Sequence, residues 1–346
     1  MPRTTLLTAD PNGIFCRVAR FIAGLAVLAG FFSGAKAEPQ HSELTQPKIE
    51  ELLAGDTGPL RGFIKNLEHS LLSGDLPSAE AVVDQDAILT RATQHCGFEG
   101  DETVRNIFCD STRRSWAETG VTRDYCNTRF RYLRPLTLKN RAGLLFRSSN
   151  RTGGINYALF TLLEPEPGQF RVADIFIVGL NEFLSDTLRR TWINVAAGFL
   201  GDEASQLKGV NNEYVTHINE IADMSRQMNA GQFEEALKSA KALPQSVQRE
   251  RSVLLIRMEA AERVSLPERN AVYADWLAAY PDEMDLPLKL THFYTTQNRF
   301  EDAERVLRSL MARLGDDALL KMEIGSLMQR QAQHDALVTK AGLSNR

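Results

Sequence analysis

The chain lacks the short motifs that carry common enzyme chemistry. It contains no G-x-S-x-G, no H-E-x-x-H, no Walker phosphate loop and no C-x-x-C. Its 6 histidines are scattered, and none has another histidine three or four positions away, which excludes a histidine pair on one helix face as a metal site. We therefore predict no catalytic residue, no metal site and no cofactor, in a protein that is not an enzyme.

Long apolar runs are also scarce, and the longest lies at residues 21–32. Arg17 and Arg20 precede this run, and an Ala-x-Ala site follows it and ends at Ala37. The pattern predicts a signal peptide over residues 1–37, cleaved near Ala37, with export to the periplasm or the medium. No later stretch approaches the roughly 20 apolar residues of a membrane helix, so we predict no integral span in the mature chain.

The chain carries no excess of positive charge. The net charge is −4, and removal of residues 1–37 takes away four basic residues and one acidic residue, which leaves −7. Nucleic-acid binding needs a basic footprint that offsets the phosphate charge. Nucleic acid is therefore excluded as the expected partner, although the 43% hydrophobic and 24% charged composition is that of an ordinary globular protein.

Cysteine is rare, with 4 in the chain and three after residue 37. An exported protein can form disulfides, but an odd number of cysteines cannot all pair within one chain. We favour a Cys96–Cys109 disulfide because the glycine-containing segment between them can turn back. Cys109–Cys126 is the alternative pairing, and three buried reduced thiols are the other alternative.

The first half of the mature chain changes its periodicity part-way. Residues 38–56 are polar, and we expect a loose lead-in; residues 57–205 pass from helical spacing to period-two alternation, which predicts an α+β domain with helices on an antiparallel meander. The expected helices span 60–72, 84–93 and 103–118 with a short one from 78, and the expected strands span 130–133, 144–147, 155–163 and 170–178. A last helix over 183–200 has Ser185 as its expected N-cap.

The end of this domain carries Asp174 on an apolar strand, then Gly179, then a helix start with Ser185 and Arg189. The arrangement resembles the closing strand and helix of the periplasmic phospholipid-shuttle (toluene-tolerance) family. The whole domain resembles the cone-shaped nuclear-transport-factor-2-like fold. These resemblances imply a cone that holds a lipid or a small apolar ligand. An apolar cavity behind four phenylalanines of this domain would favour that function, and a filled core would exclude it. The four are Phe160, Phe170, Phe176 and Phe183.

After a linker at 206–215, residues 216–346 read as helices with internal similarity. A Phe-acid-acid-Ala pattern occurs twice, 67 positions apart, which is two periods of the tetratricopeptide length. The repeated positions are Phe233 and Phe300, and Ala236 and Ala303, with Gly325 as a further small position. The segment resembles the tetratricopeptide repeat family, and that resemblance implies a solenoid of paired helices in which the small residues let two helices close.

Positive charge is concentrated in residues 111–151, which hold ten basic and two acidic residues. The basic residues that we select as candidate contacts are Arg113, Arg129, Arg131, Arg134, Arg141 and Arg147. Arginine forks onto carboxylate or phosphate, so one interpretation is an anionic partner. The other interpretation is a solvated sheet face, or docking of these arginines onto the acidic remainder of the same chain.

The combined pattern predicts an exported scaffold that binds a protein or peptide through its helical array. By helix position, the candidate contacts on that array are Gln227, Lys289, His292 and Gln329. The alternative function is a carrier of a lipid or small apolar ligand in the N-terminal cone. A third hypothesis is a hydrolase or isomerase that uses Asp174 and Tyr157; against it, Asp174 hydrogen-bonded to Arg189, Arg190 or a backbone amide is the simpler interpretation.

Overall fold

The computed structural model describes residues 42–55, 57–94, 102–149, 155–200, 212–280 and 287–340. Some of the features predicted above fall outside these ranges. They are the signal peptide at 1–37, Cys96, the first part of the linker at 206–215 and the C-terminal end.

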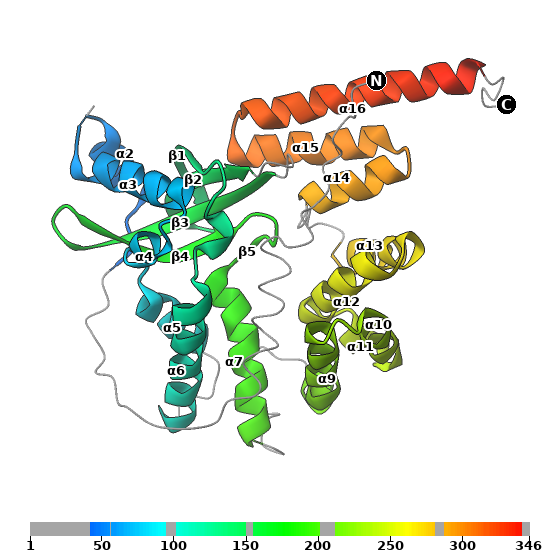
Figure 1. The fold of residues 1–346 in the computed structure, drawn as a ribbon, viewed down its shortest axis with the longest axis horizontal. Coiled ribbons are helices and arrows are strands. Elements are labelled where there is room, and N and C mark those ends of the chain that lie inside the picture. The colour runs from blue at the N-terminus through cyan, green and yellow to red at the C-terminus, as the bar shows by residue number, and fades with distance from the viewer. Residues whose placement is uncertain are drawn as a thin grey trace.

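One sheet lies between helices that precede and follow it in the chain (Figure 1). The helices of the first half are α2 (Gln46–Leu53), α3 (Pro59–Ser73), α4 (Leu76–Glu80), α5 (Gln85–Thr93), α6 (Glu102–Thr119) and α7 (Leu184–Leu200). Those of the second half are α8 (Asn212–Thr216), α9 (Ile218–Asn229), α10 (Phe233–Ala242), α11 (Gln245–Gln248), α12 (Arg251–Val264), α13 (Leu266–Ala279), α14 (Pro287–Thr296), α15 (Phe300–Leu314) and α16 (Ala318–Lys340). The predicted order, an α+β region followed by a helical region, is confirmed.

The sheet is an antiparallel meander in which each strand pairs with the next. Its strands are β1 (Arg131–Leu138), β2 (Arg141–Ser149), β3 (Ile155–Glu166), β4 (Gln169–Ile177) and β5 (Glu182–Phe183). Lys139 and Asn140, both with positive φ, form the two-residue turn between β1 and β2, as the twist of a hairpin requires. The four predicted strands are confirmed, and β5 adds a short fifth strand.

Helices α3, α5, α6 and α7 cover one face of the sheet and share one core with it. That core includes Leu67, Ile88, Phe108 and Trp192 from the helices, and Phe146, Phe160 and Ile175 from the strands. The predicted helices of this half are present, because their apolar residues recur at three- and four-residue spacing.

Helices α15 and α16 cover the opposite face of the sheet (Figure 1). Their shared core includes Leu145, Leu159 and Phe176 from the strands, Val178 just after β4, and Leu307, Leu310, Leu314, Leu320 and Ile324 from the helices. The last helices of the expected array therefore do not stand free of the α+β region. They form the third layer of a helix–sheet–helix sandwich.

The remaining C-terminal helices pack in consecutive pairs around a core of their own. Helix α9 packs on α10, α12 packs on α13, and α12 also contacts both α9 and α10. Tyr273 of α13 stacks on Phe293 of α14 with ring centroids 5.2 Å apart, which continues the stack toward α15. The helical region thus runs unbroken in contact from α9 to the sheet.

The repeated small positions have different environments. Ala236 and Ala303 are 1% and 0% exposed, as close helix packing requires, and Phe233 and Phe300 pack against the adjoining cores. The prediction for Gly325 is wrong: a Cβ built there would meet nothing within 4 Å. Helix α16 is continuous over 23 residues, and no helix of the described chain packs on that side of it.

Two local predictions in the first half are also wrong. The expected loose lead-in contains α2, where Pro47 lies in the first turn and Ile49 is fully buried. Ser185 lies inside the first turn of α7 rather than capping it, and its hydroxyl donates to Asp174 instead.

Cys109 carries a buried free thiol, so neither predicted disulfide of Cys109 is formed. Burial raises the pKa of this thiol, which keeps it protonated and inert. Within the described residues, no helix is both long and apolar enough to cross a membrane.

Candidate functional site

Arg141, the first residue of β2, joins three segments of the α+β region. Its Nη1 donates to Asp174 Oδ2 at 2.8 Å, and its Nε and Nη2 donate to the two Glu43 carboxylate oxygens at 3.0 and 2.5 Å. Arg91 of α5 adds a second ion pair to Glu43 at 3.0 Å, and the Arg141 guanidinium lies 3.8 Å from the centre of the Phe183 ring. The guanidinium of Arg141 is thus paired with carboxylates of the same chain.

Asp174 is fully buried and saturated with donors. The hydroxyl and the backbone N–H of Ser185 donate to it at 2.5 and 3.2 Å, and the N–H of Ile175 donates at 2.9 Å. Burial raises the pKa of Asp174, while Arg141 and Ser185 act in the opposite direction. The simpler interpretation of Asp174 is therefore favoured over a general base, although the partner is Arg141 rather than the arginines of α7.

The period-two alternation of β4 is interrupted at Asp174. A β-bulge lies in β4, because Thr161 pairs with Asp174 while Leu162 pairs with Val172. The extra residue places Val172 in the core under α3 to α7 and Phe176 in the core under α15 and α16. Asp174 thereby points to the end of the sheet where α7 begins.

Arg147 and Arg134 hold the start of α16 against the sheet. Arg147 pairs with Asp317, and Tyr157 donates its hydroxyl to the same carboxylate at 3.1 Å. Asp317 also accepts the backbone N–H groups of Leu319 at 2.9 Å and of Leu320, which makes it the N-cap of α16. Arg134 donates to the carbonyl oxygen of the residue before Asp317. Burial and the Asp317 carboxylate raise the pKa of Tyr157, so its hydroxyl stays a donor.

The arginine-rich segment is therefore divided. Arg113 pairs with Asp86 at 2.6 Å and with Asp110 at 2.8 Å, so it too has internal partners. Arg129 and Arg131 are exposed beside the start of β1. Four of the six candidate contacts follow the interpretation of docking onto acidic and polar groups of the same chain, which leaves two side chains for an anionic partner.

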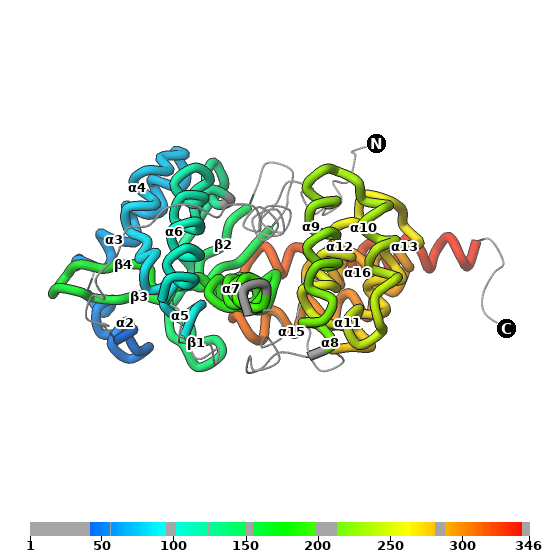
Figure 2. The backbone as a smooth tube through the Cα atoms, turned by 90° about the horizontal axis from the view of Figure 1, so that it is seen from below, coloured from blue at the N-terminus to red at the C-terminus, as the bar shows by residue number. Residues whose placement is uncertain are grey.

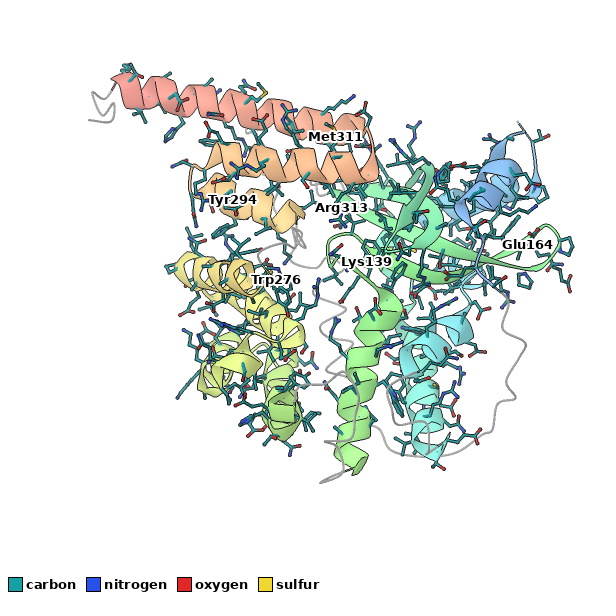
Figure 3. All side chains as sticks on the ribbon, turned by 180° about the vertical axis from the view of Figure 1, so that it is seen from behind. Lys139, Glu164, Trp276, Tyr294, Met311 and Arg313 are labelled. Carbon is teal, nitrogen blue, oxygen red and sulfur yellow. The ribbon has the colours of Figure 1, made fainter. Side chains whose placement is uncertain are left out.

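A second set of arginines joins the helical region to the turn before β5. Arg251 of α12 donates to the carbonyl oxygen of Leu180 at 2.5 Å, and Arg190 of α7 forms a two-pronged pair with Glu182 at 2.6 Å. Arg313, at the end of α15 nearest the sheet (Figure 3), donates to Asn181 Oδ1 at 2.8 Å. Arg251 and Arg313 thus attach the helical region to the turn before β5, and Arg190 attaches β5 to α7.

A cationic cluster lies among α12, α13 and α14. Lys289 donates to Glu262 at 2.6 Å, and the Tyr273 hydroxyl donates to the same carboxylate at 3.3 Å. Arg269 Nη1 lies 3.0 Å from His292 Nε2, a distance at which the imidazole accepts the hydrogen bond. Two of the predicted array contacts, Lys289 and His292, therefore meet at one place.

Counted over the described residues, the cluster carries more positive charge than its two carboxyl groups, Glu262 and Glu323, neutralise. Glu262 accepts from Lys289, but no described carboxylate pairs with Arg269. Arg330 of α16 lies close enough to affect the pKa of His292, and it also acts on the carboxyl of Glu323 in the same helix. Half-buried cations with an unbalanced charge attract an anionic group, and a planar guanidinium suits a carboxylate.

His292 makes the stability of this cluster depend on pH. Burial, with Arg269 close by, lowers the pKa of His292 below its ordinary 6.5. The imidazole of the unfolded chain therefore binds a proton at a higher pH than the imidazole of the folded chain. The contribution of neutral His292 to folding stability is fully present above about pH 6.5 and is lost as the pH falls. Between about pH 7.5 and pH 5.5, we expect the free energy of urea unfolding to fall more steeply in the unmodified chain than in His292→Gln. Equal slopes would contradict this assignment.

The other two predicted array contacts lie elsewhere. Gln227 accepts a hydrogen bond from Ser239 at 3.0 Å within the α9–α10 pair, and Gln329 is exposed on the outer side of α16. Of the four residues selected by helix position, Lys289 and His292 therefore lie in one cluster, and Gln227 and Gln329 do not.

The interior of the α+β region is filled with aromatic rings. Phe146 lies 4.7 Å from Phe130 in a stacked pair and 5.2 Å from Phe160, between ring centroids. Phe160 is 0% exposed, so its ring is enclosed on all sides by other atoms of the protein. Phe176 and Phe183 pack on each other at 5.0 Å toward the opposite face. Close packing here counts against a ligand cavity behind these phenylalanines.

Sequence reasoning missed Glu43, Glu262, Arg269 and Asp317. Asp317 had a readable signal, because an aspartate directly before a helix is a favoured N-cap. The other three act through partners 23 to 98 positions away: Arg269 reaches His292, Glu262 reaches Lys289, and Glu43 reaches Arg141, which also binds Asp174. A single sequence carries no signal for such pairings.

No protein-family model matches this chain, and no curated protein is significantly similar to it. The candidate site therefore depends on the geometry and charge of the residues themselves.

Proposed function

We propose that this chain is an exported, non-enzymatic scaffold whose helical region binds an acidic segment of another protein at the cluster of Arg269, Lys289, His292 and Arg330. Tetratricopeptide-like pairing of α9 to α15 would supply the recognition surface, and the cone-like α+β region would anchor it. The single observation that carries the proposal is the half-buried Arg269, which lies 3.0 Å from His292 and pairs with no carboxylate of the described residues.

The rest of the molecule supports a binding role over a carrier role. The aromatic interior of the α+β region is closely packed, and Asp174 is enclosed by its donors. The arginines at 134, 141 and 147 already have internal partners. The half-buried Arg269 has the charge and shape to take a carboxylate from outside.

Arg269→Gln is expected to weaken binding of a short, fluorescein-labelled peptide rich in Asp and Glu. A charge-assisted hydrogen bond to a carboxylate contributes about 1.5–3 kcal/mol, so we expect roughly tenfold or greater loss of affinity. Fluorescence anisotropy measures the dissociation constant, and binding should weaken further as salt rises from about 0.05 to 0.5 M.

The matched control is Arg305→Gln, which removes an exposed arginine of α15 whose ion pair lies along its own helix, with Asp302 at 2.8 Å. Its affinity should equal that of the unmodified chain. A peptide with Lys in place of the acidic residues should not bind. Equal affinities for Arg269→Gln and the unmodified chain would refute the proposed site, and equal binding of both peptides would refute recognition of an anion.

A further inference from the structure

The outward side of α16 carries apolar side chains that the described elements leave uncovered. Met322 and Met328 on this side are 59% and 53% exposed, and Leu337, half a turn around the helix from Met328, is 67% exposed. The other large hydrophobic side chains exposed to this degree in the described ranges are Leu72 and Leu266, one each on α3 and α13. Exposed apolar side chains gathered on one helix mark a contact surface more often than scattered ones do.

Helix α16 is the outermost helix of its side of the molecule. Its inner stripe, which includes Leu320, Ile324 and Leu327, is buried, and His334 packs on Phe300 of α15 with ring centroids 5.7 Å apart. Figure 1 shows α16 above α15 with no described element beyond it, and Figure 2 shows its C-terminal turns projecting past the other helices.

The outer stripe has the spacing of a helix that packs on another helix. Ala318, Gly325 and Ala332 recur every seven residues, so they share one side of α16, with Met322 and Met328 flanking them. A Cβ at Gly325 would meet nothing within 4 Å, which leaves room for a second helix backbone to come close.

We propose that the occupant of this stripe is α16 of a second copy of this chain, packed antiparallel about a two-fold axis between Met328 and Gln329. This register sets Gly325 opposite Ala332 of the second copy. A two-fold axis brings the same face of both copies together, and the projecting position of α16 keeps the two bodies on opposite sides of the pair.

The charges along α16 favour this occupant and this direction. In the antiparallel register, Lys321 lies beside Asp335 of the second copy, and Lys340 approaches Asp316 of the second copy. These side chains are exposed, and Lys321 now forms only a surface pair with Asp316. In a parallel register each charged side chain would lie beside the same residue of the second copy. The like charges would then repel and destabilise the pair.

Helix α16 has 23 residues, each of which adds about 1.5 Å to its length. A single pair of such helices therefore buries only a small interface. We expect a dimer that dissociates in the micromolar range, visible by sedimentation equilibrium as a doubling of mass between about 1 and 100 µM. Met322→Glu/Met328→Glu should keep the chain monomeric over that range. Leu72→Glu/Leu266→Glu, the same change at equally exposed positions on α3 and α13, should leave dimerisation unchanged.

A charge swap tests the direction of pairing. Lys321→Asp alone and Asp335→Lys alone should each weaken the dimer about tenfold, because each creates two like-charge contacts per dimer. The double variant Lys321→Asp/Asp335→Lys should restore it. Circular dichroism verifies that the helix content is retained. A monomer throughout, as expected if α16 binds a different protein, would overturn the proposal, and so would a dimer that the methionine changes leave intact or that the double variant fails to restore.

Discussion

Arg141→Ala is expected to lower the free energy of unfolding by about 3–5 kcal/mol, since it leaves a buried carboxylate without its cation. Asp174 is fully buried, and Arg141 is its charged partner at 2.8 Å. The change also removes the two hydrogen bonds to Glu43 and the contact with the Phe183 ring. Urea unfolding followed by circular dichroism at neutral pH measures the loss.

The pH dependence of that loss identifies its cause. Burial already raises the pKa of Asp174, and Arg141 holds the pKa of Glu43 below its usual value of 4.5. Protonated carboxyls need the arginine less, so the difference between Arg141→Ala and the unmodified chain should shrink as the pH falls toward 4.5. Arg129→Ala, an exposed arginine of the same segment, is the control and should leave stability unchanged. A loss as large for Arg129→Ala as for Arg141→Ala would be evidence against the internal role of Arg141.

Asp317→Ala is the second change with a large expected effect, about 3–5 kcal/mol. It leaves Arg147 without its ion pair, takes an acceptor from the Tyr157 hydroxyl, and uncaps α16. Because α15 and α16 form one layer of the sandwich, the sheet should lose stability together with the helices. Tryptophan fluorescence and circular dichroism should therefore report one shared unfolding midpoint, shifted to lower urea.

The neighbouring residue supplies the control for that experiment. Asp316 is exposed and pairs with Lys321 on the surface, so Asp316→Ala should leave the midpoint almost unchanged. If the two changes gave equal shifts, the clamp at the start of α16 would not stabilise the interface between helices and sheet.

Much of the local structure could be predicted from the sequence, because local spacing determines it. The apolar residues of α3 recur at helical spacing, and the turn at Lys139 and Asn140 separates two β-rich runs. The helix pairs α9–α10 and α14–α15 follow from the repeated phenylalanine and alanine positions. These signals lie within a few residues of the elements that they specify.

Long-range packing was less predictable, although one signal was present. Residues 158–163 of β3 are buried at every position, and a run of apolar residues without alternation is typical of a strand covered on both faces. The region was interpreted above as period-two alternation, so the second helical layer that α15 and α16 supply was not predicted.

The functions of the arginines could not be read from sequence. Arg141 and Arg147 reach carboxylates 98 and 170 positions away in the chain, so the charge run at 111–151 left an anionic partner and docking onto the same chain equally open. Arg269 and His292 are separated by 23 positions, and only the fold brings them to 3.0 Å. The candidate anion site consequently moves from the sheet to the helical region.

Hydrogen–deuterium exchange with the acidic peptide tests the central claim most directly, because it locates the bound partner. We expect slower exchange in α13 and α14, which carry Arg269, Lys289 and His292, and no change at Arg129 and Arg131 beside β1. The Arg269→Gln variant should lose that protection. Protection that appears beside β1, or that persists in α13 and α14 of the variant, would contradict the assignment of the anion site to the helical region.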